Sequence, residues 1–431
     1  MPAPAGQAGA LRFSGAVIGG SLLLQRFGVT SGASFLDVVA PLGLLLGGAF
    51  LLGGSLVLHR RRTALFALMC FLALLSAAVR TLVRGEMGGE ASLSSLAQFL
   101  ALASFATLTF AVPVDELAFY RVVNRWFAVV AAAGVAQFFL QFVRLPMFVF
   151  AGTLPDALLI ERFYNVAIPI LNTGYFKSNG FFLVEPSLLS QTMAMALLIE
   201  ILALRRPLHL CLFGAALVLS VSGTGWLMIA GFVLTVVLSL GGRGVVIAIA
   251  TVAVGALALA ALAVASPDIY EFLVSRTDEF QSPGSSGHLR FVTPWWFASD
   301  ALRDSPLTAL FGVGAGLSEH PPRPPAYDYT VNSVVKLLVE YGVPTLLAFL
   351  ALFFAGRRTR IQSALVAPAL VWLLPDGGNI QTAFVLFPVL LLVVVADLRQ
   401  AEPAADRREP APEPWPAPGP RPEPALQAAP G

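Results

Sequence analysis

The chain alternates between long apolar runs and short polar turns. Apolar runs of about 20 residues recur, and a helix of that length crosses the hydrocarbon core of a bilayer. The pattern predicts about twelve helical spans, at approximately 11–27, 35–58, 63–83, 92–112, 125–143, 185–204, 207–222, 224–240, 244–265, 330–355, 361–375 and 380–397. The expected fold class is therefore an all-α integral membrane protein with about twelve transmembrane helices.

Two longer polar stretches, 144–184 and 266–329, are expected to be extended loops. Basic turns follow only even-numbered spans, so all of them lie on one side of the membrane. The positive-inside rule makes that side cytoplasmic. These turns are 59–62, 205–206, Arg243, 357–360 and Arg399. The sequence thus predicts a multi-pass protein with both termini in the cytoplasm and both long loops on the outer face.

The pattern divides the chain into a polytopic membrane domain, 1–397, and a tail, 398–431. From Ala401 the tail is rich in Pro, Ala, Glu and Arg. Such a composition cannot bury a hydrophobic core, so we expect a disordered cytoplasmic tail.

Composition agrees with a membrane protein. Apolar residues make up 57% of the chain and charged residues 12%, with a mean hydropathy of +0.79, whereas a soluble domain carries about 25% charged residues. The net charge of +2 says little by itself, and we expect no nucleic-acid partner. Cys70 and Cys211 lie inside apolar segments without neighbouring ligands at metal-binding spacing, so neither a disulfide framework nor a metal site is expected.

Some polar side chains occur where a bilayer makes them costly. Asn332, Lys336 and Glu340 are spaced by four and form one stripe on the tenth predicted span. Either Lys336 and Glu340 neutralise each other and fix helix packing, or the stripe lines an active cavity. Gln137, Gln141 and Arg144 share a face of the fifth span, where Arg144 either reaches the lipid head groups or belongs to a cavity wall.

Further charged residues lie at the predicted outer ends of spans. Arg80 and Arg84 contact lipid head groups or bind an anionic group such as a diphosphate, since guanidinium groups bind phosphate oxygens bidentately. Glu185 precedes Pro186 at the start of the sixth span. It either complements the positive helix end or serves as a base or a sugar ligand.

The second loop holds His288 and Arg290, followed by Trp295 and Trp296. Indole rings at an outer interface are common membrane anchors, but their flat faces also stack on sugar rings, and Arg290 could hold phosphate beside them. Glycines at 312, 314 and 316 are spaced like a nucleotide-binding loop. Because no strand precedes them, we interpret them as a tight backbone turn.

Three stretches are informative together. The first is Lys-Ser-Asn-Gly-Phe-Phe at 177–182 with Glu-Pro-Ser at 185–187, and the second is Leu-Ser-Val-Ser-Gly-Thr-Gly-Trp at 219–226. The third is a series of Arg290, Gly-Val-Gly-Ala-Gly at 312–316, Asn332 and Glu-Tyr-Gly at 340–342. Over about 165–355, this order resembles the O-antigen polymerase and ligase superfamily, bacterial membrane glycosyltransferases that act on undecaprenyl-linked glycans.

The resemblance implies a polysaccharide polymerase in the bacterial inner (plasma) membrane. The enzyme would transfer a growing glycan from undecaprenyl diphosphate to the next lipid-linked repeat unit, as in O-antigen or exopolysaccharide synthesis, without a metal or nucleotide cofactor. Lys177 and Arg290 would bind the diphosphate, and Glu185 or His288 would act as base. The implied partners are undecaprenyl-diphosphate-linked glycans, the lipid bilayer, and the chain-length regulator and flippase of the same pathway.

Two departures and two alternatives accompany this reading. Lys177 stands where the family often has Arg. Val331 stands where ligases carry His, which argues against ligase chemistry, and Glu-Pro-Ser at 185–187 resembles the exopolysaccharide or O-antigen polymerase branch more closely. An O-antigen ligase that transfers lipid-linked glycan to an acceptor remains an alternative. A twelve-span transporter or flippase is disfavoured because transporters often carry internal repeats with a midplane site, and no such repeat is evident.

Overall fold

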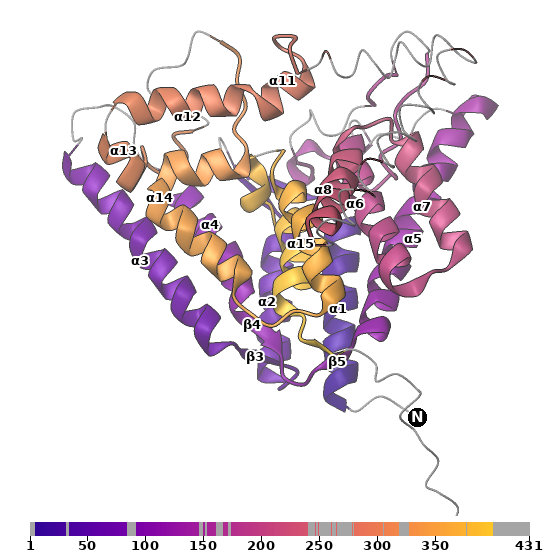
Figure 1. Cartoon of the computed structure of the whole chain (residues 1–431), viewed down its shortest axis with the longest axis horizontal. Helices are drawn as coiled ribbons and strands as arrows, with labels where there is room; N and C mark the ends of the chain where they lie inside the picture. Colours follow the sequence, from indigo (N-terminus) through magenta and orange to yellow (C-terminus); the bar gives the residue numbers. More distant parts are fainter. Residues whose placement is uncertain are drawn as a thin grey trace, which may run out of the picture.

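Helices of different lengths run side by side in the computed structural model, and short strands lie near their ends (Figure 1). The structure describes residues 5–31, 34–83, 92–145, 150, 153–160, 167–170, 174–239, 280–304, 306–318, 327–375 and 377–399, with isolated positions between 240 and 279. Its α-helices are α1 Ala5–Leu23, α2 Val39–Leu52, α3 Arg60–Val83, α4 Leu93–Ala103, α5 Glu116–Leu140, α6 Pro186–Ile199, α7 Pro207–Leu219, α8 Thr224–Ser239, α11 Ser286–Phe291, α12 Thr293–Asp304, α13 Pro306–Phe311, α14 Ser333–Phe354, α15 Arg360–Leu373 and α16 Ala383–Leu390.

The predicted helical membrane protein is confirmed. Within the described residues, 4 helices are long and apolar enough to cross a membrane: Arg60–Leu82, Glu116–Val143, Pro186–Leu204 and Ser333–Phe354. Shorter apolar helices occupy most of the other predicted spans. The number twelve stays a prediction, and the span predicted at 244–265 lies outside the described residues except for isolated positions.

Some predicted spans contain short strands, which the all-α expectation did not include. The strands are β1 Gly28–Ser31, β2 Ser34–Asp37, β3 Leu56–Leu58, β4 Leu108–Phe110, β5 Val114–Asp115 and β6 Leu398–Arg399. The span predicted at 35–58 is helical only over α2. Gly53 caps that helix and Gly54, with a φ of +70°, turns the chain, so that β3 pairs antiparallel with β4.

Buried α16 lies at the centre of the helical core. It ends in a π-helical turn, Leu391–Val395, in which the Ala396 N–H bonds to the Leu391 carbonyl. The last carbonyl groups of a helix have no further helical donor. Arg62, Arg358 and Gln362 donate to carbonyl oxygens of this turn at 2.5, 2.8 and 3.2 Å. Cationic donors at a helix C-terminus satisfy the carbonyl groups and complement the helix dipole. Arg62 and Arg358 therefore stabilise the fold.

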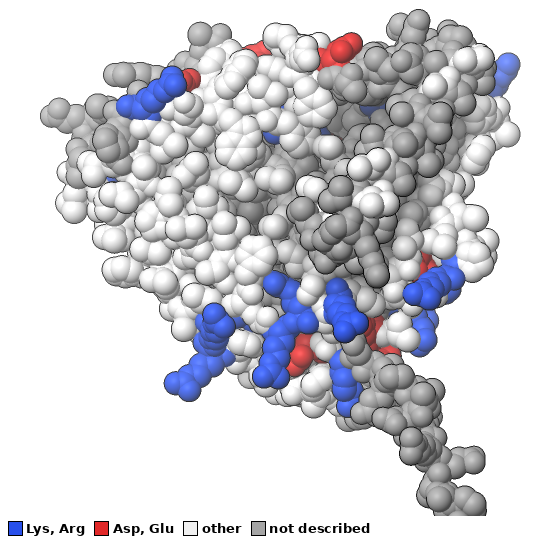
Figure 2. All heavy atoms as spheres, viewed as in Figure 1, with Lys and Arg blue, Asp and Glu red and all other residues white. Residues whose placement is uncertain are grey.

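The two ends of the bundle differ in charge. Lys and Arg side chains gather at the end where β3 and β5 lie, whereas α11, α12 and α13 cover the opposite end (Figures 1 and 2). A wide belt between these ends shows few charged side chains on this face (Figure 2). The distribution agrees with the basic turns in the sequence; which end faces the cytoplasm stays a prediction.

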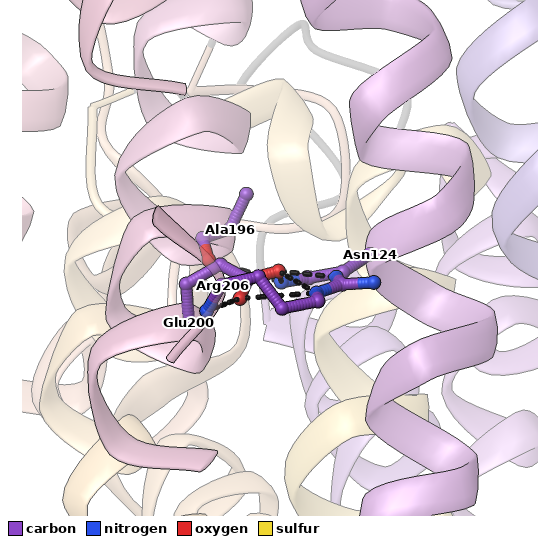
Figure 3. A network of polar contacts seen from close by, with 4 residues as sticks. All are labelled: Asn124, Ala196, Glu200 and Arg206. Carbon is purple, nitrogen blue, oxygen red and sulfur yellow. Dashed lines mark hydrogen bonds and ion pairs between the residues drawn. The ribbon is translucent and has the colours of Figure 1, made fainter. Parts of the chain in front are cut away.

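An arginine of one of those basic turns pairs with a buried carboxylate (Figure 3). Arg206, just before α7, bonds to the carboxylate of Glu200, which has 0% of its side chain exposed. Asn124 of α5 donates to Glu200 Oε1 at 3.1 Å and to the Ala196 carbonyl at 3.2 Å. A buried carboxylate requires such partners, and the network joins α5, α6 and α7.

Candidate functional site

The start of α6 is the meeting point of sequence motifs that are far apart along the chain. Pro186 occupies the first turn of the helix, as predicted, because its fixed φ suits that position. Glu185 occupies the N-cap position, but its side chain makes no capping hydrogen bond. Its Oε2 atom instead accepts hydrogen bonds from the Ser187 hydroxyl and from Arg290. The carboxylate is therefore turned toward the second loop.

Arg290 is presented by the short helix α11. Its Nη2 lies 3.1 Å from Oε2 of Glu185, and the two side chains remain 25% and 16% exposed. The Ser285 side chain caps α11 by accepting a hydrogen bond from the backbone N–H of His288. Two of the residues predicted to act in catalysis thus form a partly exposed ion pair.

Two glutamines of the fifth predicted span bind the backbone of the loop that contains Lys177. Gln137 Oε1 accepts from the Ser178 hydroxyl and from the backbone N–H groups of Asn179 and Gly180, at 2.9–3.0 Å. Gln141 bonds to both backbone groups of Phe176. The side chains that suggested a cavity wall therefore fix the backbone on either side of Lys177, a role that the helical spacing could not reveal.

The serine-rich turn packs against the same helix start. The Thr224 hydroxyl donates to the Ser187 carbonyl at 3.1 Å, and the backbone N–H of Gly225 donates to the Ser190 hydroxyl at 3.0 Å. A Cβ atom at Gly225 would lie 2.3 Å from the Ser190 carbonyl oxygen. Glycine is needed here because the two helices approach so closely.

The glycine series forms the predicted tight turn, with positive φ at Gly312, Gly314 and Gly316. The turn packs on a break in α14, where Gly342 has a φ of +83° and Pro344 follows. Proline cannot donate to the carbonyl four residues earlier, that of Glu340. Gly314 donates to this carbonyl instead, at 3.1 Å. The turn therefore satisfies backbone that the kink leaves unbonded.

Lys336 and Glu340 form a buried ion pair on the first half of α14. The Nζ–Oε1 distance is 3.6 Å, with 1% and 0% of the side chains exposed. The Ser318 hydroxyl donates to Glu340 Oε1 as well. Asn332 caps α14 by accepting from the backbone N–H of Val335 at 2.9 Å. These contacts favour the structural interpretation of the stripe, although a role in substrate binding stays a prediction.

The other arginines proposed from the sequence are Arg80, Arg84 and Arg144. Arg80 of α3 is buried and donates to the Thr308 hydroxyl of α13 at 2.9 Å. Arg144 is exposed and ends a 3-10 turn in a left-handed conformation, with a φ of 60°. Arg84 lies outside the described residues. Their proposed contacts with an anionic group are untested.

An aromatic group surrounds the end of α11. His288 is buried, with its Nδ1 unbonded among the described residues, and its ring meets the Trp296 ring edge-on at a centroid distance of 5.1 Å. Trp296 also contacts Tyr327, whose hydroxyl donates to Asp300 at 2.8 Å. Burial, followed by the hydrogen bond and negative charge of Asp300, raises the pKa of Tyr327 to about 12.

Sequence reasoning missed two residues near the end of the first predicted span, Gln25 and Arg26. Arg26 is buried and donates to the carbonyl groups of Phe181 and Leu183 at 2.9 and 2.5 Å. Gln25 Oε1 accepts from the backbone N–H of Val184 at 3.3 Å. A buried charge after α1 therefore anchors the segment that leads into Glu185. Only its polarity within an apolar region could have indicated this role.

In a comparison with known families, residues 208–350 match the family described as O-Antigen ligase. The matched region includes the serine-rich turn, Arg290, the glycine turn and Glu340, whereas Lys177 and Glu185 precede it. A search of curated proteins gives no match.

Proposed function

Because the chain carries an O-antigen ligase domain and so belongs to the O-antigen polymerase and ligase superfamily, we propose that it is a polymerase of lipid-linked glycans. It joins undecaprenyl-diphosphate-linked repeat units on the outer face of the bacterial inner membrane. The product is O-antigen or exopolysaccharide. The Glu185–Arg290 pair is the observation that carries the proposal, since it joins the matched domain to the loop before it.

The reaction makes one glycosidic bond. The hydroxyl oxygen of the acceptor sugar attacks the anomeric carbon of the donor glycan, the bond from that carbon to the lipid diphosphate breaks, and the hydroxyl proton passes to a base. Negative charge grows on the leaving diphosphate, so the site needs fixed positive charge there. Arg290 and Lys177 supply that charge in this proposal, and Arg80, Arg84 and Arg144 are further candidates.

Glu185 is our first choice as base. Its carboxylate is partly exposed, is oriented by Ser187 and Arg290, and belongs to the rigid start of α6. His288 is the second choice, because its Nδ1 has no hydrogen-bond partner among the described residues. Geometry precedes pKa in selecting a base, and Glu185 already contacts the arginine that would hold the leaving group.

A ligase is the second candidate, favoured by the description of the matched family. Val331 in place of the ligase histidine, and Glu-Pro-Ser at 185–187, resemble the polymerase branch instead. The two functions differ in what accumulates without the enzyme. A polymerase consumes single-repeat lipid intermediates, whereas a ligase consumes finished lipid-linked polymer.

A strain that lacks the gene tests the proposal. We expect single-repeat undecaprenyl-linked intermediates to accumulate and polymer to disappear, with recovery from a plasmid carrying the wild-type gene and no recovery from Arg290→Ala. Full-length polymer that remains lipid-linked would instead identify a ligase. Unchanged polymer would refute both functions. The lipid extract is analysed by mass spectrometry and the polymer on a gel.

A further inference from the structure

Helix α12 has two different faces. Phe297 and Ala298 are buried against Val331, Val335 and Val339, which belong to the beginning of α14 and the residue before its cap. Trp295, Trp296, Asp300 and Arg303 are exposed. In a helix of 3.6 residues per turn these two sets lie on opposite sides. The exposed face of α12 therefore points away from the bundle that its other face covers.

The exposed face carries large aromatic rings. Trp295 and Trp296 remain 48% and 47% exposed. The Trp296 ring is fixed from two sides, by His288 and by Tyr327, at centroid distances of 5.1 and 5.7 Å. Large exposed apolar surfaces on a protein usually mark an interaction site, and rings that are already held in place lose little conformational freedom on binding.

The surroundings of these rings favour a sugar over a lipid chain. Asp300 and Arg303 share the exposed face of α12, and charged side chains are costly inside a bilayer. Figure 1 shows α12 lying across the end of the bundle, at a steep angle to α3, rather than along its side. A sugar ring packs its C–H groups on an indole face and donates hydroxyl groups to a carboxylate. The exposed face of α12 presents both an indole and a carboxylate.

We propose that Trp295, Trp296, Tyr327 and Asp300 form a binding surface for pyranose rings of the glycan substrate. The inference rests on the proposed function, and it adds the place where the sugar part of the substrate binds. The surface directly follows α11, and His288 connects Trp296 to the helix that carries Arg290. A glycan bound here extends from the diphosphate held at Arg290 toward water.

Direct binding tests this surface. The purified full-length protein in detergent is titrated into fluorescein-labelled polysaccharide, prepared from the same strain and freed of lipid, and anisotropy is measured. Leucine preserves apolar area but not the flat ring, so Trp295→Leu/Trp296→Leu should weaken binding about tenfold or more. Phe71→Leu on α3, where the ring is 61% exposed, is the matched control and should bind as wild type. Unchanged affinity in the double variant, or no binding by the wild type, would overturn the proposal.

Quenching by lipid distinguishes the membrane-anchor alternative. Wild type, Trp295→Leu/Trp296→Leu and Phe71→Trp are reconstituted in vesicles of brominated phosphatidylcholine, which quenches indoles inside the bilayer. We expect strong quenching of the indole added in Phe71→Trp. Trp295 and Trp296, whose emission is the difference between wild type and the double variant, should be quenched little. Strong quenching of those two would make them anchors and overturn the proposal.

Polymer length distinguishes a failure of the proposed binding surface from a failure of the proposed polymerase function. In the deletion strain, the Trp295→Leu/Trp296→Leu gene should restore short chains but not the full length, because the chemical groups are intact and the glycan dissociates earlier. Full-length chains from this variant would contradict the binding surface while leaving the polymerase assignment standing. A deletion that leaves the polymer unchanged would refute the polymerase itself, whatever the binding measurement gives.

Discussion

The guanidinium group of Arg290 lies 3.1 Å from the carboxylate of Glu185, across 105 positions of the sequence. The hydrogen bond uses Nη2, and the rest of the guanidinium has no partner among the described residues. A planar guanidinium offers five N–H donors. One carboxylate thus holds the group in place while donors remain for the oxygens of a diphosphate.

We expect Arg290→Ala to abolish polymer at an unchanged protein level. Arg290→Lys should also be impaired, because a lysine ammonium cannot reproduce the fork of a guanidinium group. Polymer is measured on a gel and the protein by immunoblot of membranes. Polymer of normal length from Arg290→Ala would exclude this residue from the site.

Glu185→Gln separates positioning from proton transfer. Glutamine keeps a hydrogen-bond acceptor near Arg290 but cannot accept the proton. Partial activity would therefore assign Glu185 a positioning role, and loss of activity equal to that of Arg290→Ala would support the base. Ser187→Ala is the matched control, since it removes the other hydrogen bond to Oε2 and leaves both charges.

The apolar pattern predicted most helices because their physical cause is local. The predicted span 185–204 agrees with the helix Pro186–Leu204, and 330–355 agrees with Ser333–Phe354. The pairing of β3 with β4 was missed because it joins segments about fifty positions apart. An apolar run of few residues is compatible with a strand or with part of a helix.

Candidate site residues could be selected from the sequence, but their contacts could not. Glu185 and Arg290 were selected independently, and no spacing rule connects two loops. One of the two interpretations placed Gln137 and Gln141 on a cavity wall, and the structure shows both side chains bonded to the backbone of the Lys177 loop. Their partners are main-chain groups, which every sequence contains, so the pattern of side chains carries no sign of them.

Lys177 tests the charge requirement where the chain departs from its family. If the residue holds a diphosphate by charge, Lys177→Arg should retain activity and Lys177→Gln should lose it at a matched protein level. The backbone N–H of Lys177 donates to the Ile168 carbonyl at 2.8 Å, and neither change alters that bond. An active Lys177→Gln enzyme would make Lys177 an ordinary loop residue that contacts lipid head groups.

The buried pair on α14 should behave as one unit. Lys336→Met or Glu340→Gln alone strands a buried group, which costs about 3–5 kcal/mol for a broken buried ion pair, so protein level should fall. Lys336→Met/Glu340→Gln should restore the level, since no charge remains unpaired. A restored level with activity supports a structural pair; a restored level without activity would place the pair in the substrate site.

Accessibility of single cysteines tests the orientation. In a background with Cys70 and Cys211 replaced by Ala, we place cysteine at Ser282 or at Arg357, both exposed. Ser282 should react with an impermeant thiol reagent in intact spheroplasts, and Arg357 should react only after permeabilisation. The reverse result would put α11 in the cytoplasm and remove the outer-face site.

The contact between the glycine turn and the kink of α14 should be the most sensitive to small changes. A Cβ atom at Gly312 would lie 2.2 Å from the Glu340 carbonyl oxygen, and one at Gly342 would lie 2.3 Å from the Leu310 carbonyl oxygen. Both neighbours are backbone atoms, which cannot rotate away. Gly312→Ala adds about 1–2 kcal/mol of left-handed strain to this clash, and it separates Gly314 from the carbonyl that it satisfies.

We therefore expect Gly312→Ala to lower the Tm of the detergent-solubilised protein clearly. It should also reduce the amount of polymer, because the same turn packs on α14, the helix against which α12 is buried. Gly48→Ala on α2 is the control. A Cβ atom there meets nothing within 4 Å, and alanine in a helix interior is favoured over glycine by about 0.5–1 kcal/mol, so its Tm should stay level or rise. Equal Tm values for Gly312→Ala and wild type would mean that the glycine turn shifts to accommodate the added methyl group. The position of the loop that carries Arg290 would then not depend on this contact.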